Sequence, residues 1–115
     1  MPKGIISVTI AAGQSLSTSG DLTSSNLEMV LIPQPLDSGS QGTLNLSFQV
    51  SGDNVTFFDV IDDNGREVLR PVFGGSAIDV PGDVTTGALY VKIRAGSRNM
   101  PVPQTADRVF TLVTV

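Results

Sequence analysis

The sequence predicts an all-β protein, an antiparallel β-sandwich of about eight strands, and a jelly roll is one arrangement that the pattern allows. Three observations support this fold class. The chain is rich in Val, Ile, Ser and Thr and poor in the residues that fill helix surfaces. Apolar and polar residues alternate over several short runs, whereas helical periodicity is missing. Turn-forming residues, including 12 Gly and 7 Pro, separate these runs at strand-like intervals.

Length and composition exclude several classes of protein. With 115 residues we expect a single sandwich domain over residues 1–115. The chain has no Cys and no His, which excludes zinc fingers, Cys nucleophiles and Ser-His-Asp catalysis. A formal net charge of −4 disfavours nucleic-acid binding. No signal peptide or membrane span is expected, so the sequence predicts synthesis in the cytoplasm and no membrane partner.

The clearest strands alternate in period two. In residues 44–50 and 89–95, every second side chain, including those of Leu44, Phe48, Leu89 and Ile93, is expected to point into the core. The first strand shows the same alternation around Val8. Residues 27–32 and 109–115 are apolar on both faces, so we expect inner strands or strands whose outer face meets a partner. Weaker strands are expected over residues 55–61, 67–72 and 77–80. The polar residues 14–25 indicate a loop or a short irregular strand.

Turn signals separate these strands. Asp63-Asn64-Gly65 predicts a tight hairpin, because Asn64-Gly65 accepts the positive φ angles of a primed turn and Asp63 and Asn64 supply positive φ and polar caps. A second turn is expected over residues 51–54, and a loop follows residue 33. Residues 98–107 form the longest irregular stretch, held extended by Pro101 and Pro103.

The acidic residues around this hairpin are candidates for a metal-binding or catalytic site. Asp59, Asp62, Asp63 and Glu67 surround the hairpin, but their spacing does not match a helix-flanked calcium loop. Asp62 and Glu67 face each other across it, yet a carboxylate pair alone does not make a glycosidase. We therefore expect a turn, no catalytic residues, no metal and no cofactor.

The arginines near the proline-rich stretch have two interpretations. Arg94, Arg98 and Arg108 could contact an acidic partner, or Asp107 could pair with Arg94 or Arg108 and pin the loop. The second interpretation is favoured. Met100 at the loop tip is a candidate contact anchor, because its flexible apolar side chain adapts to different surfaces.

Three stretches resemble a family of small bacteriophage virion proteins. They are ISVTIAAGQSL from residue 6, LNLSFQVSGDNVTFFDVIDDNGREV from residue 44 and LYVKIRAGSRNMPVPQTADRVFTLV from residue 89. The resemblance implies a non-enzymatic β-sandwich that decorates and stabilises a phage capsid (a cement protein), or a head-associated relative of one.

The resemblance sets expectations for partners. They are the phage major capsid protein and further copies of the chain, as a trimer or dimer, on the virion surface. The alternative is a receptor- or carbohydrate-binding module of a phage tail or fibre. The candidate partner-contact residues are Arg98, Asn99, Met100, Pro101, Val102 and Pro103.

Overall fold

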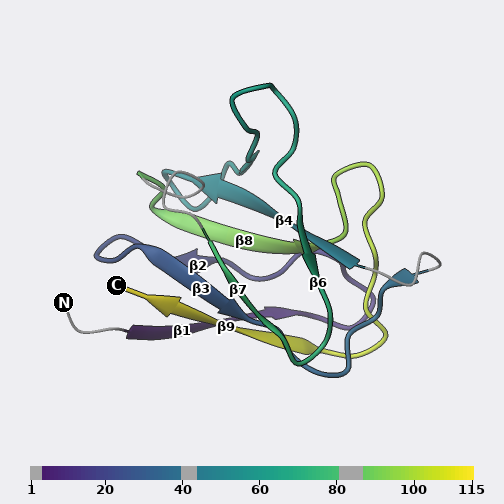
Figure 1. The fold of residues 1–115 in the computed structure, drawn as a ribbon. Coiled ribbons are helices and arrows are strands. Elements are labelled where there is room, and N and C mark those ends of the chain that lie inside the picture. Colours follow the sequence, from purple (N-terminus) through teal and green to yellow (C-terminus); the bar gives the residue numbers. More distant parts are fainter. Residues whose placement is uncertain (1–3, 40–43, 81–86) are drawn as a thin grey trace.

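The computed structural model describes residues 4–39, 44–80 and 87–115, which contain nine strands and no α-helix (Figure 1). In chain order the strands are β1 (Gly4–Ile10), β2 (Gly20–Asp21), β3 (Leu27–Leu31), β4 (Leu44–Ser51), β5 (Phe58–Asp59), β6 (Arg70–Val72), β7 (Ala77–Asp79), β8 (Tyr90–Ala95) and β9 (Arg108–Thr114). These residues contain no helix long and apolar enough to span a membrane.

The strands form two antiparallel sheets that pack face to face. Sheet A has the order β1-β9-β3-β7, and sheet B has the order β2-β8-β4-β5, with β6 also paired to β4. In Figure 1, β4 and β8 lie above β1, β9 and β3. The chain crosses from one sheet to the other between most successive strands, except that β4, β5 and β6 all lie in sheet B, and the two strand orders are those of a jelly roll, as the sequence pattern allowed.

The core lies between the two sheets. Alternate residues of each long strand point into it, which is the result expected from the period-two pattern. The fully buried side chains include Phe48, Leu46 and Ile93 from sheet B and Phe110, Leu112 and Val30 from sheet A. The predicted inward position of Leu89 is wrong, since this side chain is 40% exposed just before β8 begins.

The two strands with apolar residues on both faces are inner strands of sheet A. β9 lies between β1 and β3, and β3 lies between β9 and β7. Their inward residues are buried, whereas Val109 and Leu31 on the opposite face are 50% and 38% exposed. Of the two alternatives expected for these strands, the inner position is therefore confirmed, and contact of their outer face with a partner stays a prediction.

The structure has nine strands because part of the polar segment 14–25 forms β2, and two of the expected strands are shorter than predicted. Only Phe58–Asp59 of the expected 55–61 strand and Arg70–Val72 of the expected 67–72 strand pair with β4. Between them the chain leaves the sheet and forms the hairpin bridged by Ile61 and Glu67. The polar segment 14–25 follows the edge of β8 as an irregular strand, with β2 as its regular part.

The hairpin turn differs from the prediction in its backbone angles. Gly65 takes a positive φ of 78°, as expected of the Asn64-Gly65 pair, whereas Asp63 and Asn64 do not take the positive φ that was also expected of them. The Asp62 carboxylate accepts hydrogen bonds from the Asn64 and Arg66 amides at 2.9 and 3.0 Å. Glycine adopts this conformation without a steric penalty, so Asn64 does not need to.

Arg94 lies under the segment between β5 and β6, on the outer face of sheet B. Its guanidinium donates to Asp59 at 2.7 Å and to Glu67 at 3.1 Å, and Arg94 is 8% exposed. The predicted pairing with Asp107 is therefore wrong. The Asp107 carboxylate instead accepts a hydrogen bond from the Ala12 amide at 2.8 Å.

Candidate functional site

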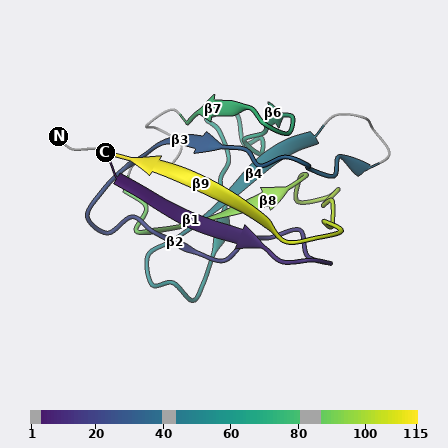
Figure 2. The ribbon, with the colours of Figure 1, turned by 90° about the horizontal axis from the view of Figure 1, so that it is seen from below.

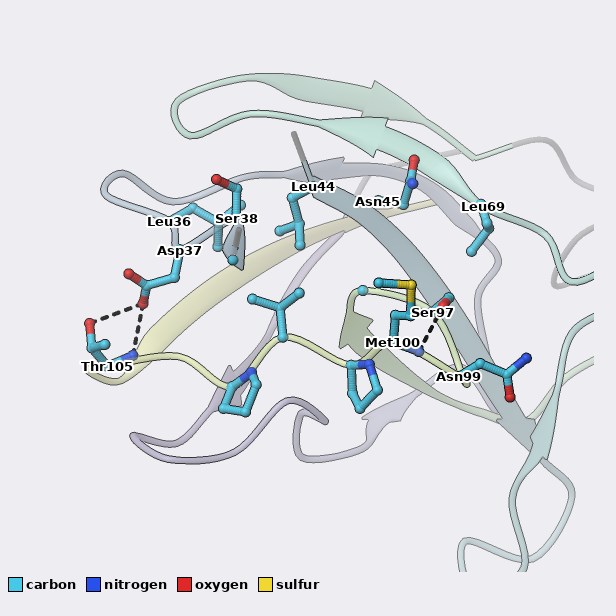
Figure 3. Close-up of a pocket in the computed structure, with 15 residues that line it drawn as sticks. Leu36, Asp37, Ser38, Leu44, Asn45, Leu69, Ser97, Asn99, Met100 and Thr105 are labelled. Carbon is cyan, nitrogen blue, oxygen red and sulfur yellow. Dashed lines mark hydrogen bonds between the residues drawn. The ribbon is translucent and has the colours of Figure 1, made fainter. Parts of the chain in front are cut away.

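An open groove of about 950 Å³ lies at one end of the sandwich (Figure 3). Its walls come from the loop that follows β3, the start of β4, the residue before β6, and the connection between β8 and β9. The lining residues are Leu36, Asp37, Ser38, Gly39, Leu44, Asn45, Leu69, Gly96, Ser97, Asn99, Met100, Pro101, Val102, Pro103 and Thr105.

The 96–103 loop forms one wall and is anchored to both β4 and β8. The Gly96 amide donates to the Asn45 carbonyl at 2.7 Å, and the Val102 amide donates to the Ala95 carbonyl at 2.8 Å. Gly96 has a φ of 92°, and a Cβ there would lie 2.9 Å from the Val102 nitrogen. Only glycine fits this close approach of two backbone segments.

The tip of this loop is closed by a small turn. The Ser97 hydroxyl accepts a hydrogen bond from the Met100 amide at 3.0 Å, as Figure 3 shows. The Arg98 amide donates to the Glu67 carboxylate at 3.0 and 3.1 Å, which connects the loop to the Arg94 cluster. The loop thus has a defined shape before any ligand arrives.

Gln104 joins the two loops that flank the groove. The residue is 1% exposed, and its side-chain oxygen accepts from the Asp37 amide at 3.0 Å and from Arg108 Nε at 3.3 Å. Its Nε2 donates to the carbonyls of Asp37 and Val102, each at 3.1 Å. A buried amide that satisfies four groups at once holds both loops in one arrangement.

The Asp37 carboxylate completes this brace. It accepts from the Thr105 amide at 2.7 Å and hydroxyl at 3.0 Å (Figure 3), and from Arg108 at 3.1 Å. The Thr105 amide, and then the Arg108 guanidinium, hold the pKa of the Asp37 carboxyl below its ordinary value. Arg108 therefore pairs with Asp37, and the predicted Arg108–Asp107 pair is wrong.

The walls of the groove combine aliphatic surface with neutral polar groups. Leu36, Leu44, Leu69 and Val102 supply the aliphatic part, and Met100 adds a side chain that is 57% exposed. The free polar groups come from three other lining residues. In the part of the chain that the structure describes, no hydrogen bond involves the side chains of Ser38, Asn45 or Asn99.

Five of the six predicted contact residues line this groove. They are Asn99, Met100, Pro101, Val102 and Pro103. Arg98 is exposed beside them but does not line the groove. Their role in binding stays a prediction.

Sequence reasoning missed the opposite wall and the brace. Leu36, Asp37 and Ser38 lie in a loop that carries no recognisable motif, and Leu69 was assigned to a strand. Gln104 follows Pro103 directly, and a polar residue inside an irregular stretch gives no sign that it will be buried.

The acidic residues around the hairpin serve the structure rather than a separate site. Asp62 accepts from two backbone amides, and Asp59 and Glu67 hold Arg94. Burial raises the pKa of the Asp59 carboxyl, but the hydrogen bonds from Arg94 and Gln49 outweigh it and leave the pKa below its ordinary value. Among the described residues, no group of three or more acidic side chains is placed to hold a metal ion.

Comparisons with known proteins do not assign the chain to a family. No protein-family model and no curated protein matches the chain. Among solved structures, the chain is similar to the CBM32 of AlyQ, determined in complex with 4,5-unsaturated mannuronic acid, with 18% identity. The match covers 96% of this chain and 74% of that chain, at a TM-score of 0.37. This likeness is too distant to assign a function.

Proposed function

We propose that this protein is a non-catalytic binding module that holds a neutral carbohydrate chain in the groove. One observation carries the proposal: unpaired amide and hydroxyl groups line a preformed groove beside aliphatic side chains. Sugars present hydroxyl groups at their edges and C–H groups on their faces, so such walls match both parts of a sugar.

The small number of charged groups in the lining of the groove favours a neutral ligand. Among the lining residues that the structure describes, Asp37 carries the only ionisable side chain, and its carboxylate is already bound by Thr105 and Arg108. An anionic ligand would meet no lining cation, and a cationic ligand would have to compete with Arg108 for Asp37. The described lining residues include no aromatic side chain, so their apolar contact with a sugar comes from Leu, Val, Pro and Met.

Rigidity supports binding through this groove. The Gln104 brace and the Gly96 turn position both walls by internal hydrogen bonds. A preformed site does not lose the conformational entropy that a flexible loop would lose on binding.

The arrangement of the carboxylates supports the non-catalytic part of the proposal. A glycosidase needs one acid whose pKa is raised, placed across a cleft from a second carboxylate. Here the pKa of Asp59 is lowered, and Asp59, Glu67 and Asp62 are all engaged in structural hydrogen bonds.

Calorimetric titration of a panel of neutral oligosaccharides tests the proposal. We expect at least one to bind, and Asn45→Ala to weaken that binding about 3- to 10-fold through loss of a hydrogen bond. Asn64→Ala is the matched control, because Asn64 lies in the hairpin turn and does not line the groove. No binding across the panel, or equal weakening by both variants, would contradict the proposal.

A second candidate function is decoration of a bacteriophage capsid, which the resemblance of three stretches to virion proteins implies. The observation that favours it is Met100, which stands 57% exposed on an anchored loop, with Pro101 and Pro103 also exposed. A rigid apolar projection suits contact with another protein.

Co-sedimentation with undecorated capsids distinguishes this second function. We expect the native chain to bind at a copy number within a few-fold of the coat protein, and Met100→Asp to bind less. Val55→Asp is the control, since Val55 is 81% exposed and lies outside the groove. Capsids that bind the native and Met100→Asp chains equally would remove this loop from the contact.

A further inference from the structure

The tip of the hairpin between β5 and β6 combines a reactive pair of residues with exposure to water. Asn64 is followed directly by Gly65, and every residue from 61 to 66 is exposed. Figure 1 shows this tip projecting away from β4 and β8 of sheet B. Figure 2, the view from below, has β1 and β9 of sheet A on the near side. The tip therefore stands in solvent on the side of the sandwich opposite to sheet A.

An Asn-Gly pair has a reaction of its own. The Gly65 amide loses its proton, its nitrogen forms a bond to Cγ of Asn64, and the Cγ–Nδ2 bond breaks as Nδ2 takes up a proton and leaves as ammonia. Glycine favours this attack because it has no Cβ to crowd the nitrogen. Water then opens the cyclic imide at either carbonyl and gives aspartate or isoaspartate. The sum is one water consumed and one ammonia released, with no oxidant or reductant.

The structure leaves both reacting groups accessible. In the described part of the chain, no hydrogen bond involves the side-chain amide of Asn64. A Cβ built on Gly65 would meet no atom within 4 Å, so this side of the turn is open. The restraint on the reaction is the hydrogen bond from the Gly65 amide to the Asp62 carbonyl at 3.0 Å. Because this bond lies at an exposed tip, local opening frees the nitrogen while the sheets stay folded.

The other asparagines are placed less favourably. Each precedes a residue whose side chain crowds the attacking nitrogen, and these pairs are Asn26-Leu27, Asn45-Leu46, Asn54-Val55 and Asn99-Met100. Asn45 also lies within β4, where backbone pairing fixes its conformation. Asn54 and Asn99 are exposed, as Asn64 is. They therefore serve as internal controls for the effect of the following residue.

We propose that Asn64 is a site of spontaneous deamidation and the asparagine that converts first in the folded chain. Conversion to aspartate adds one negative charge beside Asp62 and Asp63. Conversion to isoaspartate inserts one carbon into the backbone between the Asn64 and Arg66 amides. The Asp62 carboxylate binds these two amides at 2.9 and 3.0 Å, so the isoaspartate product cannot keep both bonds unchanged.

Incubation of the folded chain in mildly alkaline buffer, followed by peptide mapping with mass spectrometry, tests the proposal. We expect the mass increase of an amide-to-acid change to appear at Asn64 before Asn54 or Asn99. An isoaspartyl methyltransferase is expected to label the same peptide. Parallel incubation in urea measures the reaction in the unfolded chain. One turn hydrogen bond of ordinary net strength is expected to make the folded chain about 2- to 10-fold slower at Asn64.

Asn64→Gln is the matched variant, because a side chain one methylene longer must close a larger and less favourable ring. It is expected to lose the early conversion, whereas Asn54→Gln is expected to convert at Asn64 as the native chain does. Conversion that begins at Asn54 or Asn99 would overturn the proposal. So would a folded chain that stays unmodified at Asn64 while the unfolded chain converts completely. None of these results depends on whether the groove binds carbohydrate.

Discussion

Replacing Gln104 with alanine removes the side chain that holds the two walls of the groove together. Four groups lose a hydrogen-bond partner: the Asp37 amide, Arg108 Nε and the carbonyls of Asp37 and Val102. Gln104 is 1% exposed, so water reaches these groups only if the loops separate. The expected result is a less stable protein whose groove has lost its shape.

The loss of stability in Gln104→Ala comes mainly from two buried N–H donors, the Asp37 amide and Arg108 Nε, which lose their acceptor. A buried donor without a partner costs about 1–3 kcal/mol, so two of them and the lost side-chain contacts give about 3–4 kcal/mol. That is a large part of the roughly 5–15 kcal/mol that stabilises a typical domain. In urea, an m value of about 1.5 kcal/mol/M converts this loss into a midpoint lower by about 2 M.

Gln49→Ala is the matched control for this experiment. Gln49 is half-buried and makes one side-chain hydrogen bond, to Asp59 at 3.2 Å, so its loss is expected to cost about 1 kcal/mol or less. Equilibrium unfolding followed by circular dichroism measures both variants. A midpoint for Gln104→Ala within error of that for Gln49→Ala would refute the view that Gln104 braces the groove.

Two further predictions concern the same region. Gly96→Ala places a Cβ against the Met100 carbonyl and 3.0 Å from the Pro101 Cα, at a positive φ, so we expect a loss of about 2–4 kcal/mol in urea unfolding; a loss below about 0.5 kcal/mol would show that the loop is not held there. Because the pKa of the Asp37 carboxyl is lowered in the folded protein, its contribution is complete well above the ordinary value of about 3.9 and is lost as the pH falls through and below it. Stability measured from pH 6 to pH 3 should therefore fall less steeply in Asp37→Asn than in the native chain, and parallel curves would contradict this assignment.

The sandwich was predictable because each long strand buries one face. Alternation at Leu44, Leu46 and Phe48 marks the inward side of β4 directly, and apolar residues on both faces mark β3 and β9 as inner strands. The turn between the expected strands 55–61 and 67–72 was predicted, but their shortening to β5 and β6 was not, because residues on both sides of the turn keep a strand-like composition even where the chain leaves the sheet. The ion pairs of Arg94 with Asp59 and Glu67 in this region join residues far apart in the sequence, so local patterns do not reveal them.

The sequence predicted a contact loop, which forms one wall of the groove, but not the groove itself. Its proline-rich wall is a contiguous stretch with an exposed Met100, which local sequence reveals. The other wall comes from Leu36, Asp37 and Leu69, which reach the groove through the fold. The ion pairs failed as predictions for the same reason: proximity to Asp107 in sequence favoured it as a partner, whereas the sheets bring Asp37 to Arg108 and Asp59 to Arg94.

The most direct test of the central claim is a nuclear magnetic resonance titration of the native chain with the neutral oligosaccharide that binds best in the panel. The account predicts that the largest backbone shift changes fall on residues 96–103, on Asn45 and on the loop around Ser38, with little change on β1 and β9. Shift changes concentrated elsewhere, or none at saturating sugar, would contradict the claim that this groove is the binding site.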